Sequence, residues 1–358
     1  MKAKAIQLLR DLTEAHSAPG AEGAVRSIFA NELADFNLST DKLGSVVADK
    51  PADGPRVLIC GHMDEVGFMV QNITSDGFIQ FTPVGGWWGH TLLAQRVRIL
   101  TRKGGEHIGV ICSTPPHFLG PDATKKVMAI DKMFIDIGAV SREDVTERYG
   151  IKIGDSIVPD SRFEQLTNPD IYMAKAFDNR VGMALAIQAM QELKDVDLPN
   201  HLFSAGSVQE EIGTRGAESL SALVKPDLAL ILEGPPADDT PGFNRKDSQG
   251  KLTGGVQLRL YDPSAIMNRK LADFVAEFAE SKGINYQVTV RRNGGTDAKA
   301  IQRYDIGVPV VVIGVPARYI HTHNSLININ DYLDAVKLMK ELVPALDSAT
   351  VNSFSKFL

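Results

Sequence analysis

The feature that most limits how this chain can fold is an alternation of apolar and helix-like segments that stops near residue 66 and resumes near residue 166. The runs LALIL (228–232) and VPVVVIGV (308–315) are almost continuously apolar, and a similar run begins at residue 56. Strands have this composition when helices cover both faces of a parallel sheet. Helix-like segments lie between the runs, which predicts an α/β fold with a mainly parallel sheet flanked by helices.

Helical spacing of apolar residues and short β-type runs place the remaining elements. We expect helices over 6–12, 25–33, 179–193, 219–223, 272–283 and 330–346. We expect strands beginning at residue 56 and over 202–208, 228–232, 256–262, 286–292 and 308–315.

The segment from about 70 to 165 has a different character. It consists of short alternating stretches separated by turns, with no helix longer than about two turns except one near 141–150. Short strands spaced by turns are typical of a small barrel or sandwich. The sequence therefore predicts a discontinuous α/β domain formed by residues 1–66 plus 166–358, interrupted by an inserted β-rich domain over 67–165.

Charge and cysteine content exclude several classes of function. The formal net charge of −6 gives no positive field that would attract nucleic acid or an anionic membrane. The two cysteines are too few for a disulfide framework, and no apolar run approaches the roughly 18 residues of a membrane span. The N-terminal segment also lacks the continuous apolar stretch of a secretion signal. We therefore expect a cytoplasmic protein.

Acids and histidines cluster at the ends of predicted strands, where open α/β sheets place their functional sites. The candidates are His62, Asp64, Asp178, Glu210, Glu211, Glu233, His321 and His323.

His62 and Asp64 are two residues apart on a strand, so their side chains point the same way. Asp64 could orient the imidazole while the other ring nitrogen binds a metal, although a hydrogen-bonded core pair is the alternative. Glu233 ends a buried strand, and a carboxylate there needs either a partner or a metal.

Glu210 and Glu211 follow an apolar strand, and Gly213 and Gly216 indicate a turn beyond them. The pair could be a charged strand exit, or one carboxylate could bind metal while the other transfers protons. Asp178 precedes a helix and could be its N-cap. His321 and His323 are two residues apart, so either both could bind a metal or only one of them could.

These residues are more informative together than separately. Two imidazoles and three carboxylates are the donors required by two Zn²⁺ or Co²⁺ ions when one carboxylate bridges them. The sequence therefore predicts a site for two divalent metal ions.

The chain resembles the M42 family of metallo-aminopeptidases, which includes glutamyl aminopeptidases and self-compartmentalising tetrahedral aminopeptidases. The resemblance rests on motifs that occur in the family's order along the whole chain: GHMDEVGF, PVGGW, AFDNRVG, QEEIGTRGA, GGTDA and RYIHT. It implies a zinc-peptidase-like fold in which the inserted domain mediates dimerisation. It also implies a homo-oligomer, with dimers that can assemble into twelve-subunit tetrahedral shells.

Carried over residue by residue, the resemblance implies that His62 and Glu233 bind one metal, that Glu211 and His321 bind the other, and that Asp178 bridges them. Glu210 would be the general base, and Asp64 the partner of His62. The segment implied to lie near the substrate is Gly294, Gly295, Thr296 and Asp297. The family's aminopeptidases commonly have Asp where this chain has Glu233.

The implied reaction is removal of N-terminal residues from peptides by a water that bridges the two metals, with Glu210 transferring protons. One alternative is a metal-dependent amidase or deacetylase acting on small acylated amines. Another is a two-carboxylate glycoside hydrolase, which has no use for His62 and His321. A third is a binding protein that has kept the fold without turnover.

Overall fold

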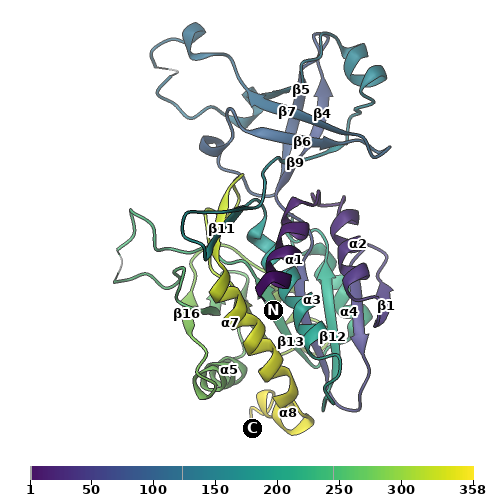
Figure 1. Cartoon of the computed structure of the whole chain (residues 1–358), viewed down its shortest axis with the longest axis vertical. Helices are drawn as coiled ribbons and strands as arrows, with labels where there is room; N and C mark the ends of the chain where they lie inside the picture. The colour runs from purple at the N-terminus through teal and green to yellow at the C-terminus, as the bar shows by residue number, and fades with distance from the viewer. Residues whose placement is uncertain (1, 123, 245) are drawn as a thin grey trace.

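The computed structural model describes residues 2–122, 124–244 and 246–358. A closed six-stranded barrel stands above a larger α/β body (Figure 1). The chain enters the barrel after β3 (Arg56–His62) and returns to the larger body before β11 (Ile171–Ala174). The expected α/β fold with an inserted barrel is confirmed.

The larger body is built on a nine-stranded sheet with the order β1-β2-β12-β3-β13-β17-β14-β15, and β16 pairs with β14. Besides β3, its strands are β1 (Asn37–Thr40), β2 (Val46–Lys50), β12 (His201–Ser207), β13 (Leu228–Glu233), β14 (Val256–Asp262), β15 (Ala265–Ile266), β16 (Tyr286–Val290) and β17 (Val310–Gly314). The central strands β12, β3, β13 and β17 run parallel to one another. Their carboxyl ends therefore meet at one edge of the sheet.

Helices cover both faces of this sheet, as the apolar strands require. Along β3, Ile59 packs into one hydrophobic core and its neighbour Leu58 into another. The first core is covered by α1 (Lys2–Glu14), α2 (Gly23–Glu32), α3 (Phe177–Glu192), α5 (Arg269–Ser281), α7 (Ile329–Leu342) and α8 (Ser348–Phe354). The second is covered by α4 (Arg215–Val224) and α6 (Ala298–Ile301).

Helix α3 packs closely against the sheet at Gly182, which has no side chain. A Cβ atom at this position would lie 2.4 Å from the Leu232 carbonyl oxygen of β13. Such a contact is too short, so only glycine allows this approach. The close packing places the start of α3, which carries Asp178, beside the ends of β3 and β13.

The barrel has the strand order β4-β5-β8-β7-β6-β9. Its strands are β4 (Gly67–Ile73), β5 (Ile79–Val84), β6 (Arg96–Leu100), β7 (Glu106–Cys112), β8 (Phe134–Asp136) and β9 (Ser156–Pro159). Its interior is filled by apolar side chains such as Phe68, Ile99 and Ile157, all fully buried. The expected short helix near 141–150 is a five-residue turn of π-helix at Asp144–Arg148.

A second, four-stranded sheet connects the chain leaving the barrel to the C-terminal region. Its order is β10 (Glu164–Gln165), β11, β19 (Ser325–Asn328) and β18 (Ala317–Arg318). His321 lies in the segment between β18 and β19, so this small sheet fixes the approach of that segment to the rest of the molecule.

Most predicted elements begin and end within four residues of their expected limits, but several features differ. The last predicted helix ends as α7 at Leu342 and is followed by a 3₁₀ turn at Val343–Ala345. Helix α8, the β1–β2 pair and the small sheet were not predicted. Within the described residues, no helix combines the length and apolar character needed to cross a membrane.

Candidate metal centre

The predicted site residues converge at the carboxyl edge of the central sheet. His62 ends β3, Glu233 ends β13, and Glu210 and Glu211 follow β12. Asp178 lies at the start of α3. Together with His321, these side chains line one cavity of about 340 Å³.

The Asp178 carboxylate lies between the two histidines. Its Oδ1 atom is 3.2 Å from His62 Nε2, and its Oδ2 atom is 3.3 Å from His321 Nε2. Asp178 and Asn179 have non-helical backbone angles, and it is Asn179 Oδ1 that accepts a hydrogen bond from the Gly182 amide, at 3.0 Å, so the capping alternative for Asp178 is not realised. One oxygen toward each imidazole is the arrangement that a bridging carboxylate requires.

Two groups of possible ligand atoms share Asp178. One contains His62, Asp178 and Glu233, the other contains Asp178, Glu211 and His321, and the atoms of each group lie within 4.8 Å of one another. His62 Nε2 is 3.9 Å from Glu233 Oε2, and His321 Nε2 is 3.3 Å from Glu211 Oε2. A third, overlapping group contains His62, Glu210 and Glu211.

Each histidine is oriented from behind through its Nδ1 atom. His62 Nδ1 lies 3.0 Å from the Asp64 carbonyl oxygen and 3.5 Å from its carboxylate. His321 Nδ1 lies 2.9 Å from the Gly86 carbonyl oxygen, in the loop that follows β5. A proton held at Nδ1 leaves Nε2 free to bind a metal, so both imidazoles face the cavity with the ligating nitrogen.

The Asp64 carboxylate mainly contacts the backbone. Its two oxygens accept hydrogen bonds from the amides of Glu210 and Glu211, each at 3.0 Å. Asp64 therefore supports the turn after β12 as well as His62. This turn brings both glutamates to the cavity, where an extended chain would direct them to opposite faces.

Burial shapes the acidity of the carboxylates. It raises the pKa of Glu210 well above its usual range, raises the pKa of Glu211, and raises the pKa of Glu233 to about 8. For Asp178, burial is outweighed by hydrogen bonds from His321 and His62, which hold its pKa below the usual range. The site thus concentrates carboxylates whose charge water does not stabilise.

The neighbouring carboxylates change the pKa values of both imidazoles. Burial lowers the pKa of His321, but Glu211 and Asp178 outweigh it and raise the pKa to about 11. Burial likewise opposes the rise of the His62 pKa, which Asp178 and Asp64 bring well above its usual value. Both imidazoles thus lie among carboxylates that favour a positive charge at this place, which a bound cation would supply.

The donor set fits divalent cations. Glu211 Oε1 is buried and has no hydrogen-bond partner among the described residues. A buried carboxylate oxygen in that position costs free energy unless a cation or a donor satisfies it. Imidazole nitrogens combined with carboxylate oxygens are typical ligands of Zn²⁺ and Co²⁺.

His323 does not join the cluster. Its side chain is buried against Trp87, with ring centroids 5.8 Å apart, and neither ring nitrogen has a partner within the described chain. Burial lowers the pKa of His323 to about 4, as expected for an imidazole packed in the core. Of the two alternating histidines, His321 is the one that faces the cavity.

The predicted substrate segment lies only partly on the cavity surface. Gly294, Gly295 and Thr296 line the cavity. Asp297 is buried behind it, where it accepts a hydrogen bond from the Ser207 hydroxyl, and burial raises its pKa to about 6. Asp297 is therefore placed to support the segment from within.

Sequence reasoning did not identify Arg259, which also lines the cavity. Its side chain is 6% exposed, and Nη1 donates to Asp262 Oδ2 at 3.2 Å. Its Nε atom is buried without a partner among the described residues. Nothing in the strand sequence VQLRLYD distinguishes this arginine, because only the fold shows that it reaches the cavity.

Comparison with known proteins gives a consistent result. A family model described as M42 glutamyl aminopeptidase matches residues 44–338. The glutamyl aminopeptidase of Lactococcus lactis is 34% identical over 98% of both chains. The crystal structure of a TET aminopeptidase from Thaumarchaeota archaeon SCGC AB-539-E09 is 40% identical over 99% of both chains, with a TM-score of 0.95. The TET1 peptidase of Pyrococcus horikoshii, whose structure shows assembly into a tetrahedron or a large octahedral shell, is 31% identical, covers 96% of this chain and 100% of its own, and has a TM-score of 0.85.

Proposed function

The chain belongs to the M42 glutamyl aminopeptidase family, a family of metal-dependent peptidases, and on that premise we propose that its catalytic centre holds two divalent ions about Asp178. His62 and Glu233 would hold one ion, and Glu211 and His321 the other. The observation that carries this proposal is the Asp178 carboxylate, which has one oxygen near each histidine. The donor types support Zn²⁺ or Co²⁺ as the ions.

When bound, the ions would supply an activated water and polarise the peptide carbonyl. Glu210 would act as the general base, taking a proton from the attacking water and giving it to the leaving amine. Its carboxyl lies in the cavity, with Oε2 3.9 Å from His62 Nε2. Burial raises the pKa of Glu210, because the cavity stabilises its charge less than water does.

The cut after one residue requires a group that binds the free α-amine. We assign this role to Glu233, a 5% exposed carboxylate at the end of β13. An ammonium group beside it would form a charge-assisted hydrogen bond with little competition from water. A peptide with a blocked N-terminus cannot make this contact.

Arg259 supports a preference for an acidic N-terminal residue. Its guanidinium lines the same cavity as Glu233, and its Nε atom lacks a partner among the described residues. The positive charge of the guanidinium would attract a substrate carboxylate that enters the cavity, whereas an apolar side chain would gain nothing from it. Glu and Asp are therefore the N-terminal residues that we propose for the preferred substrates.

The homo-oligomeric state is part of the proposal. We propose that residues 67–165 form a dimerisation domain and that the dimers assemble into a tetrahedral dodecamer. The described part of the barrel exposes the large apolar side chains Trp88, Phe118 and Val140, which would be covered at an interface between copies. Sedimentation of the intact chain should show species larger than a monomer, and a monomer alone would contradict this part.

Two free cysteines, Cys60 and Cys112, support the proposal that the enzyme works in the reducing cytoplasm. Membership in a peptidase family favours the aminopeptidase over the glycoside hydrolase and over the amidase acting on small acylated amines.

A substrate panel tests the proposed function. Aminoacyl chromogenic substrates with free and with blocked N-termini are assayed after complete chelation and again after adding Zn²⁺, Co²⁺ or Mn²⁺. Activity on free N-termini should disappear on chelation and return with metal, and blocked substrates should stay uncut. Turnover that survives full metal removal, or equal turnover of blocked substrates, would contradict the proposal.

A further inference from the structure

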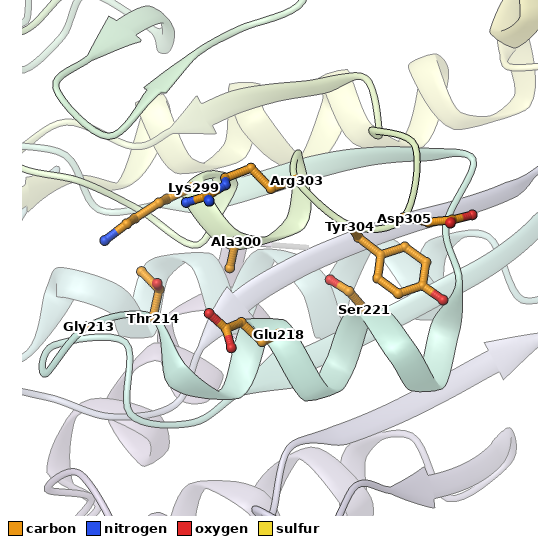
Figure 2. Close-up of a pocket in the computed structure, with 9 residues that line it drawn as sticks. All are labelled: Gly213, Thr214, Glu218, Ser221, Lys299, Ala300, Arg303, Tyr304 and Asp305. Atoms are coloured by element: carbon orange, nitrogen blue, oxygen red, sulfur yellow. The ribbon is translucent and has the colours of Figure 1, made fainter.

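A second cavity adjoins the catalytic one. It has a volume of about 350 Å³ and lies between α4 and the segment that begins with α6 (Figure 2). Figure 2 shows Lys299 and Arg303 along one side and Thr214, Glu218 and Ser221 along the other. Neither the catalytic residues nor the predicted substrate segment account for this cavity.

The two cavities share a wall. Gly213, Thr214 and Lys299 line both of them. The amides of Gly213 and Thr214 donate to the Glu210 carbonyl oxygen, each at 2.9 Å. The turn that separates the cavities is therefore the turn that carries the proposed general base.

The sheet order gives the substrate a direction. Glu233 ends β13 and Glu210 follows β12, with β3 between these two strands. If the α-amine binds at Glu233 and Glu210 protonates the leaving amine, the rest of the peptide leaves on the β12 side. The second cavity meets the catalytic one at the turn after β12 that carries Glu210, so it opens beside the group that would protonate the leaving amine.

The second cavity contains cations available for a ligand. Lys299 and Arg303 form no ion pair within 4.0 Å with any residue that the structure describes. Both side chains line the cavity, and Lys299 also reaches the catalytic cavity. Glu218 and Asp305 also line the cavity, so a carboxylate would bind on the side formed by Lys299 and Arg303, which both donate charge-assisted hydrogen bonds.

We propose that this cavity is the subsite for the leaving part of the substrate and that Lys299 and Arg303 bind the C-terminal carboxylate of a short peptide. The inference rests on the proposed function, because the direction of the peptide comes from the roles of Glu233 and Glu210. It defines the substrate class as short peptides with a free C-terminus. Every such peptide carries this carboxylate, whatever its sequence.

The test uses pairs of peptides that share the same N-terminal residue, have two to six residues, and differ only in a free or amidated C-terminus. The wild-type enzyme should prefer the free acid in kcat/KM by about threefold to tenfold at one or two lengths, which corresponds to about 1 kcal/mol. The difference should lie in KM, because the contact is remote from the reacting bond. It should shrink as salt is raised.

The variants are Lys299→Met, Arg303→Met and the double variant, with Lys103→Met on the barrel surface as the matched control. The ratio of free acid to amide is measured within each variant, so a change in overall activity or folding cancels. The ratio should fall toward one in the double variant and keep its wild-type value in Lys103→Met. A wild-type ratio of one at every length, or an unchanged ratio in the double variant, would overturn the inference.

Two further experiments distinguish failure of the subsite assignment from failure of the proposed function. Amidated peptides with Glu or Gln as their second or third residue show whether the cavity instead selects an acidic side chain. A preference that follows this side chain and ignores the terminus would overturn the assignment. If wild-type enzyme cleaves aminoacyl chromogenic substrates but ignores the C-terminus, only this inference fails, whereas loss of all N-terminal cleavage in the metal-loaded enzyme would overturn the proposed function as well.

Discussion

The carboxylate of Asp64 accepts a hydrogen bond from the backbone amide of Glu210, with a donor–acceptor distance of 3.0 Å. A single buried side chain thereby connects the strand that carries His62 to the turn that carries the proposed base. Asp64 is fully buried, so water cannot replace either of its contacts. The orientation of the base and that of a metal ligand depend on the same group.

Replacement of Asp64 by Asn tests this connection. The side-chain amide would present an N–H group to one of the two backbone amides that the carboxylate now accepts from. We expect kcat/KM to fall by about 10- to 100-fold, as for other residues that orient metal ligands, together with weaker metal binding. Asp273→Asn, on the exposed side of α5, is the control. Wild-type kinetics in Asp64→Asn would show that the connection is unimportant.

Replacing Glu210 should affect turnover alone, whereas replacing Glu211 should affect both turnover and metal content. Glu210→Gln should lower kcat by about 10²- to 10⁴-fold while the metal content stays at the wild-type level, because the amide cannot accept the proton. Glu211→Gln should lower both activity and metal content, since Glu211 is a proposed ligand. Kinetics and metal analysis on the same preparations separate the two roles. A fully active Glu210→Gln enzyme would remove Glu210 from the mechanism.

Arg259 should determine the preference for the first residue. In Arg259→Met we expect the ratio of kcat/KM for N-terminal Glu to that for N-terminal Leu to fall by about tenfold or more, as hydrogen bonds to charged groups contribute about 1.5–3 kcal/mol. Arg259→Lys should retain part of the ratio, because it keeps the charge and loses the planar fork. A wild-type enzyme that prefers Leu or Lys over Glu would contradict the assignment.

His16 should affect stability in acid. Burial, together with the charges of Lys175, Arg98 and Arg180, lowers the pKa of His16 from its usual 6.5 to about 3. Its Nε2 atom lies 2.7 Å from the Ser156 hydroxyl of β9, so it sits where the barrel meets the α/β body. The unfolded chain takes up this proton first as the pH falls, so protonation favours unfolding. The free energy of unfolding should therefore decrease below about pH 6.5, by up to about 1.4 kcal/mol per pH unit, until about pH 3.

The measurement is denaturant unfolding of metal-free protein at several pH values, which keeps metal release out of the comparison. Between pH 6.5 and pH 4.5, the free energy of unfolding of His16→Gln should decrease less steeply with falling pH than that of wild type. The control is His117→Gln, at an exposed position in the barrel domain, whose free energy of unfolding should decrease with falling pH as steeply as that of wild type. Parallel curves for all three proteins would contradict the effect of His16.

The sequence predicts the central strands well because burial on both faces requires a nearly continuous run of apolar residues. Residues 228–233 are all buried, and such a strand has to be almost purely apolar. The β1 strand gives no comparable signal, since all four of its residues are exposed and their pairing depends on β2. The strands of the small sheet have two to four residues, too few to show an alternation.

For the site, the sequence identifies the residue types but not their arrangement. Asp178 is equally compatible with an N-cap until α3 is placed against β3 and β13. Asp297 belongs to a matched motif, yet its side chain turns inward to Ser207. Arg259 and Lys299 could not be identified, because they lie on a strand and a helix without any local pattern, and only the tertiary fold brings them to a cavity.

The central claim is that Asp178 is shared by two metal ions. The most direct test is a crystal structure of the protein loaded with Zn²⁺ or Co²⁺, with anomalous difference maps collected at the metal's absorption edge. We predict two peaks in the catalytic cavity, one beside His62 and Glu233 and one beside His321 and Glu211, with the Asp178 carboxylate between them. A map without peaks there, or with a single ion that does not contact Asp178, would contradict the account.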